Sequence, residues 1–256
     1  MKLKALALAF ALAFVAASSR VMTVTNGTPD GNRHPYVGTV IQPIPSMPGF
    51  VSVCSGSALS STKFLTAAHC ADPGIVYVSY DMGLPFPSGF TPGIFTPDPD
   101  WCIGCSPGLQ GFDSHDVAVV TLLTPNNPGA FATLPAAGLV DTLPMKTSVD
   151  IVGYGVQGFI RGGGQPQQIF PFSRYFAPSQ LVQSNNKASD EFIKLTANPS
   201  QGTGGVCFGD SGGPDILSGT KTVLGVNSYV TNTNCAGVTY SQRVDLPEIL
   251  AFINSF

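Results

Sequence analysis

Short runs of β-branched and other apolar residues, separated by glycine, proline, asparagine and serine, recur along most of the chain. Examples are residues 37–41, 75–80, 117–123, 148–152 and 222–226. Runs of this length between turn residues are typical of β-strands. Helix-like apolar spacing is confined to residues 246–253, where Pro247 suits a first helical turn. The pattern predicts an all-β protein with one terminal helix.

The length of the chain favours more than one β-unit. A chain of 256 residues suits two modest all-β units, and residues 124–143, rich in Pro, Asn, Gly and Ala, have no strand pattern and suit a linker. Because 43% of residues are hydrophobic and only 11% are charged, disorder is excluded. A formal net charge of -3 argues against binding to a phosphate backbone, so no nucleic-acid partner is expected.

The first residues have the pattern of a secretory signal. Lys2 and Lys4 precede an apolar run over residues 5–17, which ends in small residues. This pattern predicts a signal peptide over residues 1–18, and the run is too short to span a bilayer. Residues 19–23 are a candidate short propeptide. The mature protein is therefore expected to be secreted, with no membrane association once the signal is removed.

Secretion favours disulfides for the six cysteines, because the extracellular compartment is oxidising. Zinc is the competing interpretation, since Cys102 and Cys105 have ligand spacing and His115 is near. No fourth ligand stands at a convincing spacing, and after Val76 only Asp81 is available for calcium. Neither a metal nor another cofactor is expected.

Three segments carry residues suited to nucleophilic catalysis. His69 stands beside a cysteine after an apolar run, Asp116 precedes the apolar run at 117–123, and Ser211 lies among glycines at 209–213. A serine hydroxyl needs an imidazole to accept its proton, and the imidazole needs a carboxylate to fix its tautomer. Flanking glycines leave backbone amides free to face a developing oxyanion. The three segments together indicate acyl-transfer chemistry.

These segments resemble those of the chymotrypsin/trypsin-like serine peptidases, in which the order is also His, Asp, Ser. Gly-Tyr-Gly at residues 153–155 stands where that family usually has Gly-Trp-Gly. Further similar segments cover nearly all of the mature chain: residues 24–27, 35–36, 54–59, 228–230 and 243–244. The resemblance implies a secreted serine endopeptidase.

The fold implied by the resemblance is all-β, with two antiparallel Greek-key β-barrels packed face to face and a C-terminal helix. Residues 24–130 would form the N-terminal barrel with His69 and Asp116. Residues 131–245 would form the C-terminal barrel with Ser211, and residues 246–256 the helix.

The resemblance also implies a role for each matching residue. His69 would be the general base, Asp116 its orienting carboxylate and Ser211 the nucleophile, with the amides of Gly209 and Ser211 as the oxyanion hole. It implies two disulfides, Cys54–Cys70 and Cys207–Cys235. Cys102 and Cys105 match no usual pair of the family and are predicted, by elimination, to bond to each other.

The specificity pocket carried over from the family has Gly205 at its base and Gly237 on one wall. Because Gly205 offers no carboxylate, a preference for lysine or arginine is not expected. Val230 would narrow the pocket, which predicts cleavage after small or medium apolar residues. Residues 228–230, Ser228-Tyr229-Val230, are expected to pair with the substrate as an added strand.

Asp210 is expected to be buried and to need a positive partner, because an unpaired buried carboxylate is costly. In the family a new N-terminal ammonium meets this aspartate. The family-like start is Val24, but the preceding Thr23 is not basic, and the nearest tryptic bond is Arg20–Val21. Three alternatives stay open: a start at Val24, a start at Val21, or an internal arginine, Arg161 or Arg174.

Other functional classes fit the sequence less well. Residues 209–213 match the G-x-S-x-G elbow of α/β-hydrolases, but every histidine precedes Ser211, whereas that fold needs one after it. An inactive binding protein on the trypsin fold is the main alternative, although the three catalytic residues are present. Expected partners are protein or peptide substrates and proteinaceous protease inhibitors, and the protein is expected to be a monomer.

Overall fold

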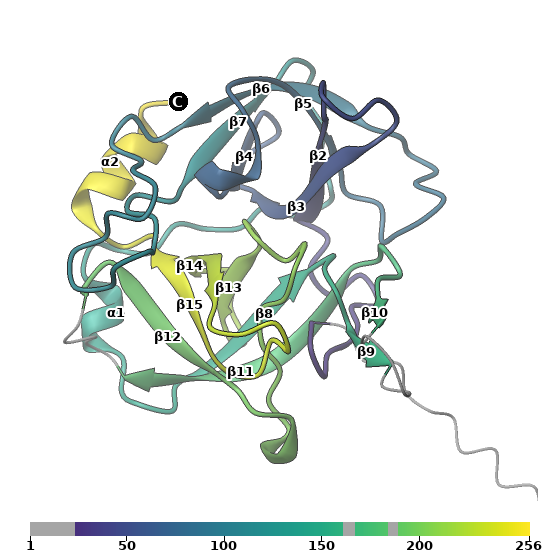
Figure 1. The fold of residues 1–256 in the computed structure, drawn as a ribbon. Coiled ribbons are helices and arrows are strands. Elements are labelled where there is room, and N and C mark those ends of the chain that lie inside the picture. The colour runs from purple at the N-terminus through teal and green to yellow at the C-terminus, as the bar shows by residue number, and fades with distance from the viewer. Residues whose placement is uncertain (1–23, 161–166, 184–188) are drawn as a thin grey trace, which may run out of the picture.

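The structure, a computed structural model, describes residues 24–160, 167–183 and 189–256. They form two antiparallel β-barrels, one above the other in Figure 1, with the C-terminal helix beside them. The predicted all-β fold with two barrels and a terminal helix is confirmed. The predicted signal peptide, the candidate propeptide and Arg161 lie outside the described residues.

The N-terminal barrel closes through pairing of its first and fourth strands, β2 and β5, and the strand order around it is β2-β3-β4-β7-β6-β5. In β5, Val76 and Val78 point inward while Ile75 and Tyr77 are exposed, because successive side chains of a strand point to opposite faces. The strands are β2 (Val37–Pro43), β3 (Val51–Ala58), β4 (Lys63–Thr66), β5 (Gly74–Ser79), β6 (Thr91–Pro97) and β7 (Ala118–Leu122).

The C-terminal barrel closes because β8 pairs with both β11 and β13. A register shift between Leu181 and Gln183 marks a bulge in β11, the longest of these strands. The strands are β8 (Ser148–Gly153), β11 (Tyr175–Gln183), β12 (Phe192–Ala197), β13 (Pro214–Leu217), β14 (Val223–Val230) and β15 (Gly237–Arg243).

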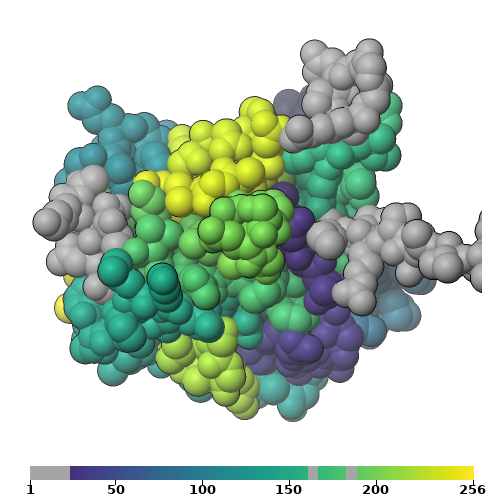
Figure 2. Space-filling view, turned by 90° about the horizontal axis from the view of Figure 1, so that it is seen from below, coloured from purple at the N-terminus to yellow at the C-terminus, as the bar shows by residue number. Residues whose placement is uncertain are grey.

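The N-terminal segment packs on the C-terminal barrel. Strand β1 (Thr28–Pro29) pairs with β11, Thr25 forms a bridge with Gly205, and Val24 belongs to the apolar cluster inside that barrel. In Figure 2 these purple residues lie against the green ones of the C-terminal barrel. The expected N-terminal barrel begins at residue 24, but residues 24–29 pair with the C-terminal barrel instead.

Helix is scarce, as the sequence indicates. In α2 (Pro247–Asn254), Ile249 and Ile253 are fully buried against the apolar cluster that joins the two barrels. The expected linker contains one helical turn that the sequence did not predict, α1 (Leu139–Thr142). The remaining short elements are the turns η1 (Ala68–Cys70) and η2 (Pro199–Gln201) and the hairpin of β9 (Gly158–Ile160) with β10 (Gln167–Ile169). No helix in the described residues is long and apolar enough to cross a membrane.

A buried ion pair fastens the N-terminal segment to the two barrels. Arg174, just before β11, and Asp30 are both fully buried, and Arg174 Nε lies 3.0 Å from Asp30 Oδ2. His34 donates its backbone N–H to the same oxygen at 3.0 Å, and its Nδ1 lies 2.6 Å from the other. Burial opposes ionisation of Asp30, but His34 and Arg174 outweigh it and lower its pKa.

The remaining guanidinium hydrogens of Arg174 reach into the N-terminal barrel. Nη1 donates to the carbonyls of Val37 at 2.7 Å and Tyr80 at 3.1 Å, and Nη2 donates to Asn32 Oδ1 at 2.8 Å. The suggestion that Arg174 neutralises Asp210 is therefore wrong, because all three nitrogens are engaged elsewhere. Arg174 instead links three parts of the chain that are distant in sequence.

Candidate active site

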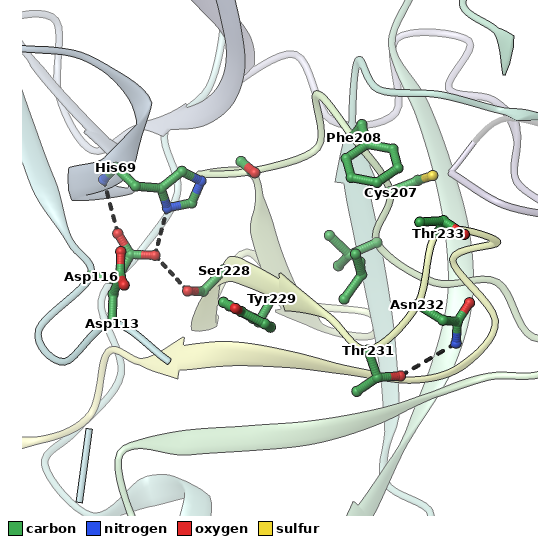
Figure 3. A pocket seen from close by; sticks show the side chains of 13 residues that line it. His69, Asp113, Asp116, Cys207, Phe208, Ser228, Tyr229, Thr231, Asn232 and Thr233 are labelled. Atoms are coloured by element: carbon green, nitrogen blue, oxygen red, sulfur yellow. Dashed lines mark hydrogen bonds and ion pairs between the residues drawn. The ribbon is translucent and has the colours of Figure 1, made fainter. Parts of the chain in front are cut away.

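His69 lies in the turn η1 directly after β4, at the surface where the two barrels meet. The Cys54–Cys70 disulfide ties this turn to β3. Its side chain is 30% exposed, and its Nδ1 lies 2.7 Å from Asp116 Oδ2 (Figure 3). Burial of the imidazole lowers its pKa, but the charge and hydrogen bond of Asp116 outweigh burial and Asp113 adds to them, so the pKa of His69 is raised.

Asp116 is fully buried at the start of β7, and its carboxylate is completely hydrogen-bonded. Oδ1 accepts the backbone N–H of His69 at 3.0 Å, and Oδ2 accepts the hydroxyl of Ser228 from the C-terminal barrel. Burial alone would raise the pKa of Asp116. The charge of His69 and these hydrogen bonds together outweigh burial, so the pKa of Asp116 falls below its ordinary value. The carboxylate is held ionised, with an oxygen aimed at the imidazole.

Ser211 lies in a turn that is braced by the N-terminal barrel. Ser55 of β3 donates its N–H to the carbonyl of Ser211 at 2.8 Å and its hydroxyl to the carbonyl of Gly209 at 2.9 Å. With these carbonyls directed at Ser55, the N–H groups of Gly209 and Ser211 make no hydrogen bond to any described residue. Two unpaired amides beside a serine hydroxyl suit the stabilisation of an oxyanion.

Gly212 fits a space that no other residue could occupy. Its φ is +79°, and a Cβ there would stand 2.1 Å from Thr66 Oγ1 and 2.4 Å from the carbonyl oxygen of Ser55. The strand leading to His69 and the turn carrying Ser211 therefore approach each other at this glycine.

One cavity of about 500 Å³ joins these residues. His69, Asp116 and Ser211 line it together with Ser228, Tyr229 and Val230, which are three of the five predicted pocket residues. No hydrogen bond joins Ser211 Oγ to His69 Nε2 here, and such contacts are often long without substrate. Cys207, predicted as a disulfide partner of Cys235, also lines the cavity. The remaining lining residues have no role predicted from the sequence: Asp113, Val206, Phe208, Thr231, Asn232 and Thr233.

Gly205 and Gly237, the other two predicted pocket residues, do not line this cavity. A Cβ on Gly205 would lie 2.3 Å from Ala197 Cβ, so a side chain there would point at the buried residue Ala197 and not into the cavity. Gly237 has a φ of +97° and open space around it. The cavity is instead lined by the apolar side chains of Val206, Phe208 and Val230, beside the Cys207–Cys235 disulfide.

A comparison with protein families decides the identity of the fold. The family model described as Trypsin matches residues 28–250. The chain belongs to the trypsin family. It is similar to chymotrypsin-like elastase family member 1 of the cat, Felis catus, at 25% identity over 222 residues, which covers 83% of this chain and 80% of the relative.

Solved structures support the same fold. Human heparin binding protein has a TM-score of 0.65 at 18% identity, covering 91% of this chain and 96% of that one. A structure titled HL collagenase has a TM-score of 0.65 at 17% identity, covering 87% and 93%. At these identities the likeness concerns the trypsin-family fold alone.

The disulfides of this trypsin-family chain are Cys54–Cys70, Cys102–Cys105 and Cys207–Cys235, the same pairs that the sequence predicts. The bond between Cys102 and Cys105 consumes both thiols, which removes the zinc interpretation of that pair. His115 does not line the cavity that holds Ser211, and its Nδ1 lies 3.5 Å from Asp98 Oδ2. Asp98, Asp100 and His115 gather within 4.8 Å, apart from the cavity.

Asp210, the residue before the nucleophile, is fully buried. Its oxygens accept the N–H groups of Gly155 at 2.8 Å and Cys207 at 3.0 Å, and no cation pairs with it among the described residues. Burial raises its pKa to about 7, despite these two hydrogen bonds. Among the described residues, the carboxyl that precedes Ser211 thus has no compensating positive charge.

A second buried carboxyl, Asp215, lies in β13. Both of its oxygens are buried without a hydrogen-bond partner. Burial raises its pKa to about 7, against a weaker opposing effect of the Ser241 hydroxyl. Asp210 and Asp215 therefore each hold a proton more tightly in the folded chain than an aspartate in water does.

We expect the uncut chain to lose stability as the pH rises. Between about 4 and about 7 the folded state binds more protons at Asp210 and Asp215 than the unfolded state does. The free energy of unfolding should therefore fall by up to about 1.4 kcal/mol per pH unit for each carboxyl. Urea midpoints at pH 5 and pH 8 measure this difference, and Asp215→Asn should reduce it.

The exposed Asp72→Asn is the matched control and should leave the difference between pH 5 and pH 8 unchanged. The pKa of His69 is also raised, so His69 too makes the folded state less stable as the pH rises. The contribution of Asp215 is therefore measured by comparing Asp215→Asn with Asp72→Asn. An Asp215→Asn protein with the same pH dependence as the parent would show that this carboxyl does not titrate differently on folding.

Proposed function

We propose that the chain is a secreted serine endopeptidase in which His69, Asp116 and Ser211 act as a catalytic triad. The observation that carries this proposal is the fixed His69–Asp116 pair at 2.7 Å, which shares one cavity with Ser211 and two unpaired amides. Membership of the trypsin family supports it. The three disulfides fit an oxidising, extracellular location.

The proposed reaction follows from which groups of the site donate and accept protons. Asp116 accepts the Nδ1–H of His69, which leaves Nε2 free to take the proton of Ser211 Oγ as that oxygen bonds to the substrate carbonyl carbon. The carbonyl oxygen becomes an oxyanion between the N–H groups of Gly209 and Ser211. The C–N bond then breaks, and the proton passes from His69 to the leaving amine. Water repeats the sequence and hydrolyses the acyl-enzyme.

For specificity we propose cleavage after small or medium apolar residues. Val206 and Val230 present apolar surface to the cavity, and no lysine or arginine lines it. The residue before the scissile bond (P1) would occupy this end, while the substrate backbone pairs with Ser228–Val230 in β14. Ser211, Gly209 and the P1 carbonyl would then lie together.

Val230→Gly is expected to raise kcat/KM for peptides with phenylalanine at P1 by about tenfold, because removal of the valine side chain widens the apolar end of the cavity. Peptides with alanine at P1 should change less than about threefold, which makes them the internal control. A peptide-library profile of the unmodified protein measures the same preference. Cleavage mainly after arginine or lysine would contradict the proposed specificity.

Activation is proposed to occur by cleavage ahead of Val24. Val24 is buried in the C-terminal barrel, next to the bridge between Thr25 and Gly205, and Asp210 has no cationic partner among the described residues. A new ammonium at Val24 would supply one. N-terminal sequencing of active secreted protein tests this start against Val21.

An inactive binding protein on the same fold is the alternative function. The complete set of His69, Asp116, Ser211 and unpaired amides favours the enzyme, because a binding role needs none of these contacts. In either case we propose that protein or peptide chains, including proteinaceous protease inhibitors, bind in the groove, by which we mean the cavity lined by His69, Ser211 and Val230. We also propose that the protein acts as a monomer.

A further inference from the structure

Asp113 is a third charged side chain beside the His69–Asp116 pair. A carboxylate oxygen of Asp113, a ring nitrogen of His69 and an oxygen of Asp116 all lie within 4.8 Å of one another. Asp113 is half-buried and lines the same cavity as Ser211 (Figure 3). The proposed triad does not use it.

The disulfide-closed turn at Cys102–Cys105 holds this carboxylate in place. Gly104, inside the turn, donates its N–H to Asp113 Oδ1 at 2.9 Å, and Trp101 Nε1 lies 3.4 Å from Oδ2. The backbones of Cys102 and Ser114 exchange two hydrogen bonds, of 3.1 and 2.9 Å. Donors on both oxygens fix the direction of the Asp113 carboxylate.

The residues around Asp113 are anchored to the C-terminal barrel. The ring of Phe112 stacks on Tyr229 with centroids 3.9 Å apart, and the Tyr229 hydroxyl donates to the carbonyl of Gly111 at 3.0 Å. The hydroxyl of Ser114 donates to Glu191 Oε1 at 2.8 Å. Asp113 is therefore a rigid feature of the groove wall rather than a side chain on a free loop.

Asp113 has no positive partner of its own. No lysine or arginine pairs with it in the part of the chain that the structure describes, and none lines the cavity. Asp113 and Asp116 are the acidic residues among the lining residues, and Asp116 is already hydrogen-bonded to His69 and Ser228. The free charge facing the groove is thus that of Asp113.

The geometry of an extended substrate directs one side chain toward Asp113. Successive side chains of a strand point to opposite faces. If the P1 side chain enters the end of the cavity at Val206 and Val230, the preceding residue (P2) points to the other side. In Figure 3 that side holds His69, Asp116 and Asp113, opposite Cys207 and Asn232.

We propose that Asp113, held by the Cys102–Cys105 turn, recognises a lysine or arginine side chain at P2 of the substrate. This specificity rests on the proposed peptidase function and adds a cationic P2 to the apolar P1. It also gives a role to the disulfide that matches no usual pair of the family: it shapes the turn whose Gly104 amide orients the carboxylate.

The test compares two fluorogenic peptides that are identical, with alanine at P1, except for lysine or norleucine at P2. Norleucine keeps most of the aliphatic chain and removes the charge. We expect mature protein to cleave the lysine peptide with a kcat/KM about tenfold higher, as for a partly exposed charge-assisted contact. This ratio should fall as the salt concentration rises, because ions screen the pair.

Asp113→Asn should bring the ratio close to one, since the amide oxygen can still accept the Gly104 N–H while the charge is lost. Each variant is measured at its own pH optimum, because Asp113 also raises the pKa of His69. Asp100→Asn, an exposed carboxylate in the same loop that does not line the cavity, is the matched control and should keep the tenfold ratio.

The outcomes separate this inference from the proposed function. Equal cleavage of both peptides by the unmodified protein, or a lysine preference that survives in Asp113→Asn or is insensitive to salt, would overturn the role of Asp113 alone. Cleavage of neither peptide by mature protein would overturn the peptidase function, and the P2 preference with it.

Discussion

Ser211→Ala is expected to lower kcat on a peptide substrate by roughly 10⁴- to 10⁶-fold. The alanine removes the nucleophile that forms the acyl-enzyme, but it leaves the Gly209 and Ser211 amides and the groove in place. The residual rate above water should come from those features alone. His69→Ala should cost a similar factor, because the serine hydroxyl without a base is a poor nucleophile.

Because Ser211 and His69 act in the same step, we expect the effects of their substitutions on kcat to be strongly non-additive. The double variant of Ser211 and His69 should be no slower than Ser211→Ala, because each single change already disables the same step. Initial rates with a fluorogenic peptide measure this, and exposed Ser88→Ala serves as the control with unchanged rate. A Ser211→Ala protein with more than about one percent of the parent rate, far above that range, would place the nucleophile elsewhere.

Arg174→Met is expected to lower the free energy of unfolding by about 3–5 kcal/mol. The methionine fills much of the space of the arginine but leaves the Asp30 carboxylate buried without its cation. It also removes the Arg174 N–H groups that the carbonyls of Val37 and Tyr80 accept. Because Arg174 links the N-terminal segment, β2 and β11, the loss acts on the junction of the two barrels.

Urea unfolding measures this loss as a shift in midpoint. Adding Asp30→Asn to Arg174→Met should recover part of the stability, since the pair is coupled and the stranded charge is removed. Arg33→Met is the matched control: this exposed arginine lies over the ring of Phe176 and should cost about 1 kcal/mol or less. A change below about 0.5 kcal/mol in Arg174→Met, the range of ordinary surface substitutions, would show that the buried pair is not a stability determinant.

The sequence predicted the strands better than the short elements between them. The run at residues 37–41 appears within β2 and that at 75–80 overlaps β5, because a run of β-branched residues between turn residues is a clear strand signal. The four-residue α1 and the β9–β10 hairpin left no such signal, since neither is long enough to show a period. Pairing of β1 with the distant β11 depends on tertiary packing and could not be read from local pattern.

In the candidate site, too, residues in local motifs could be predicted, and residues whose role depends on tertiary contacts could not. His69, Asp116 and Ser211 stand in distinctive motifs, so the sequence proposed them and the structure brings them to one cavity. Asp113 stands three residues before Asp116, yet the motif gave it no role, because its partners lie in a separate turn.

For Arg174 the sequence suggests a partner that the structure does not support. The sequence makes Arg174, like Arg161, a candidate partner for Asp210, but the fold buries Arg174 against Asp30. Which of two buried carboxyls an arginine meets is decided by strand pairing over long sequence separations.

Covalent labelling tests the central claim most directly. Mature protein, with its N-terminus established by sequencing, is treated with an organophosphate serine-hydrolase probe, and the adduct is mapped by peptide mass spectrometry. The account predicts one adduct per molecule, on Ser211, and none in Ser211→Ala or in protein inhibited beforehand. An adduct that persists in Ser211→Ala, or active protein that takes up no label on Ser211, would contradict it.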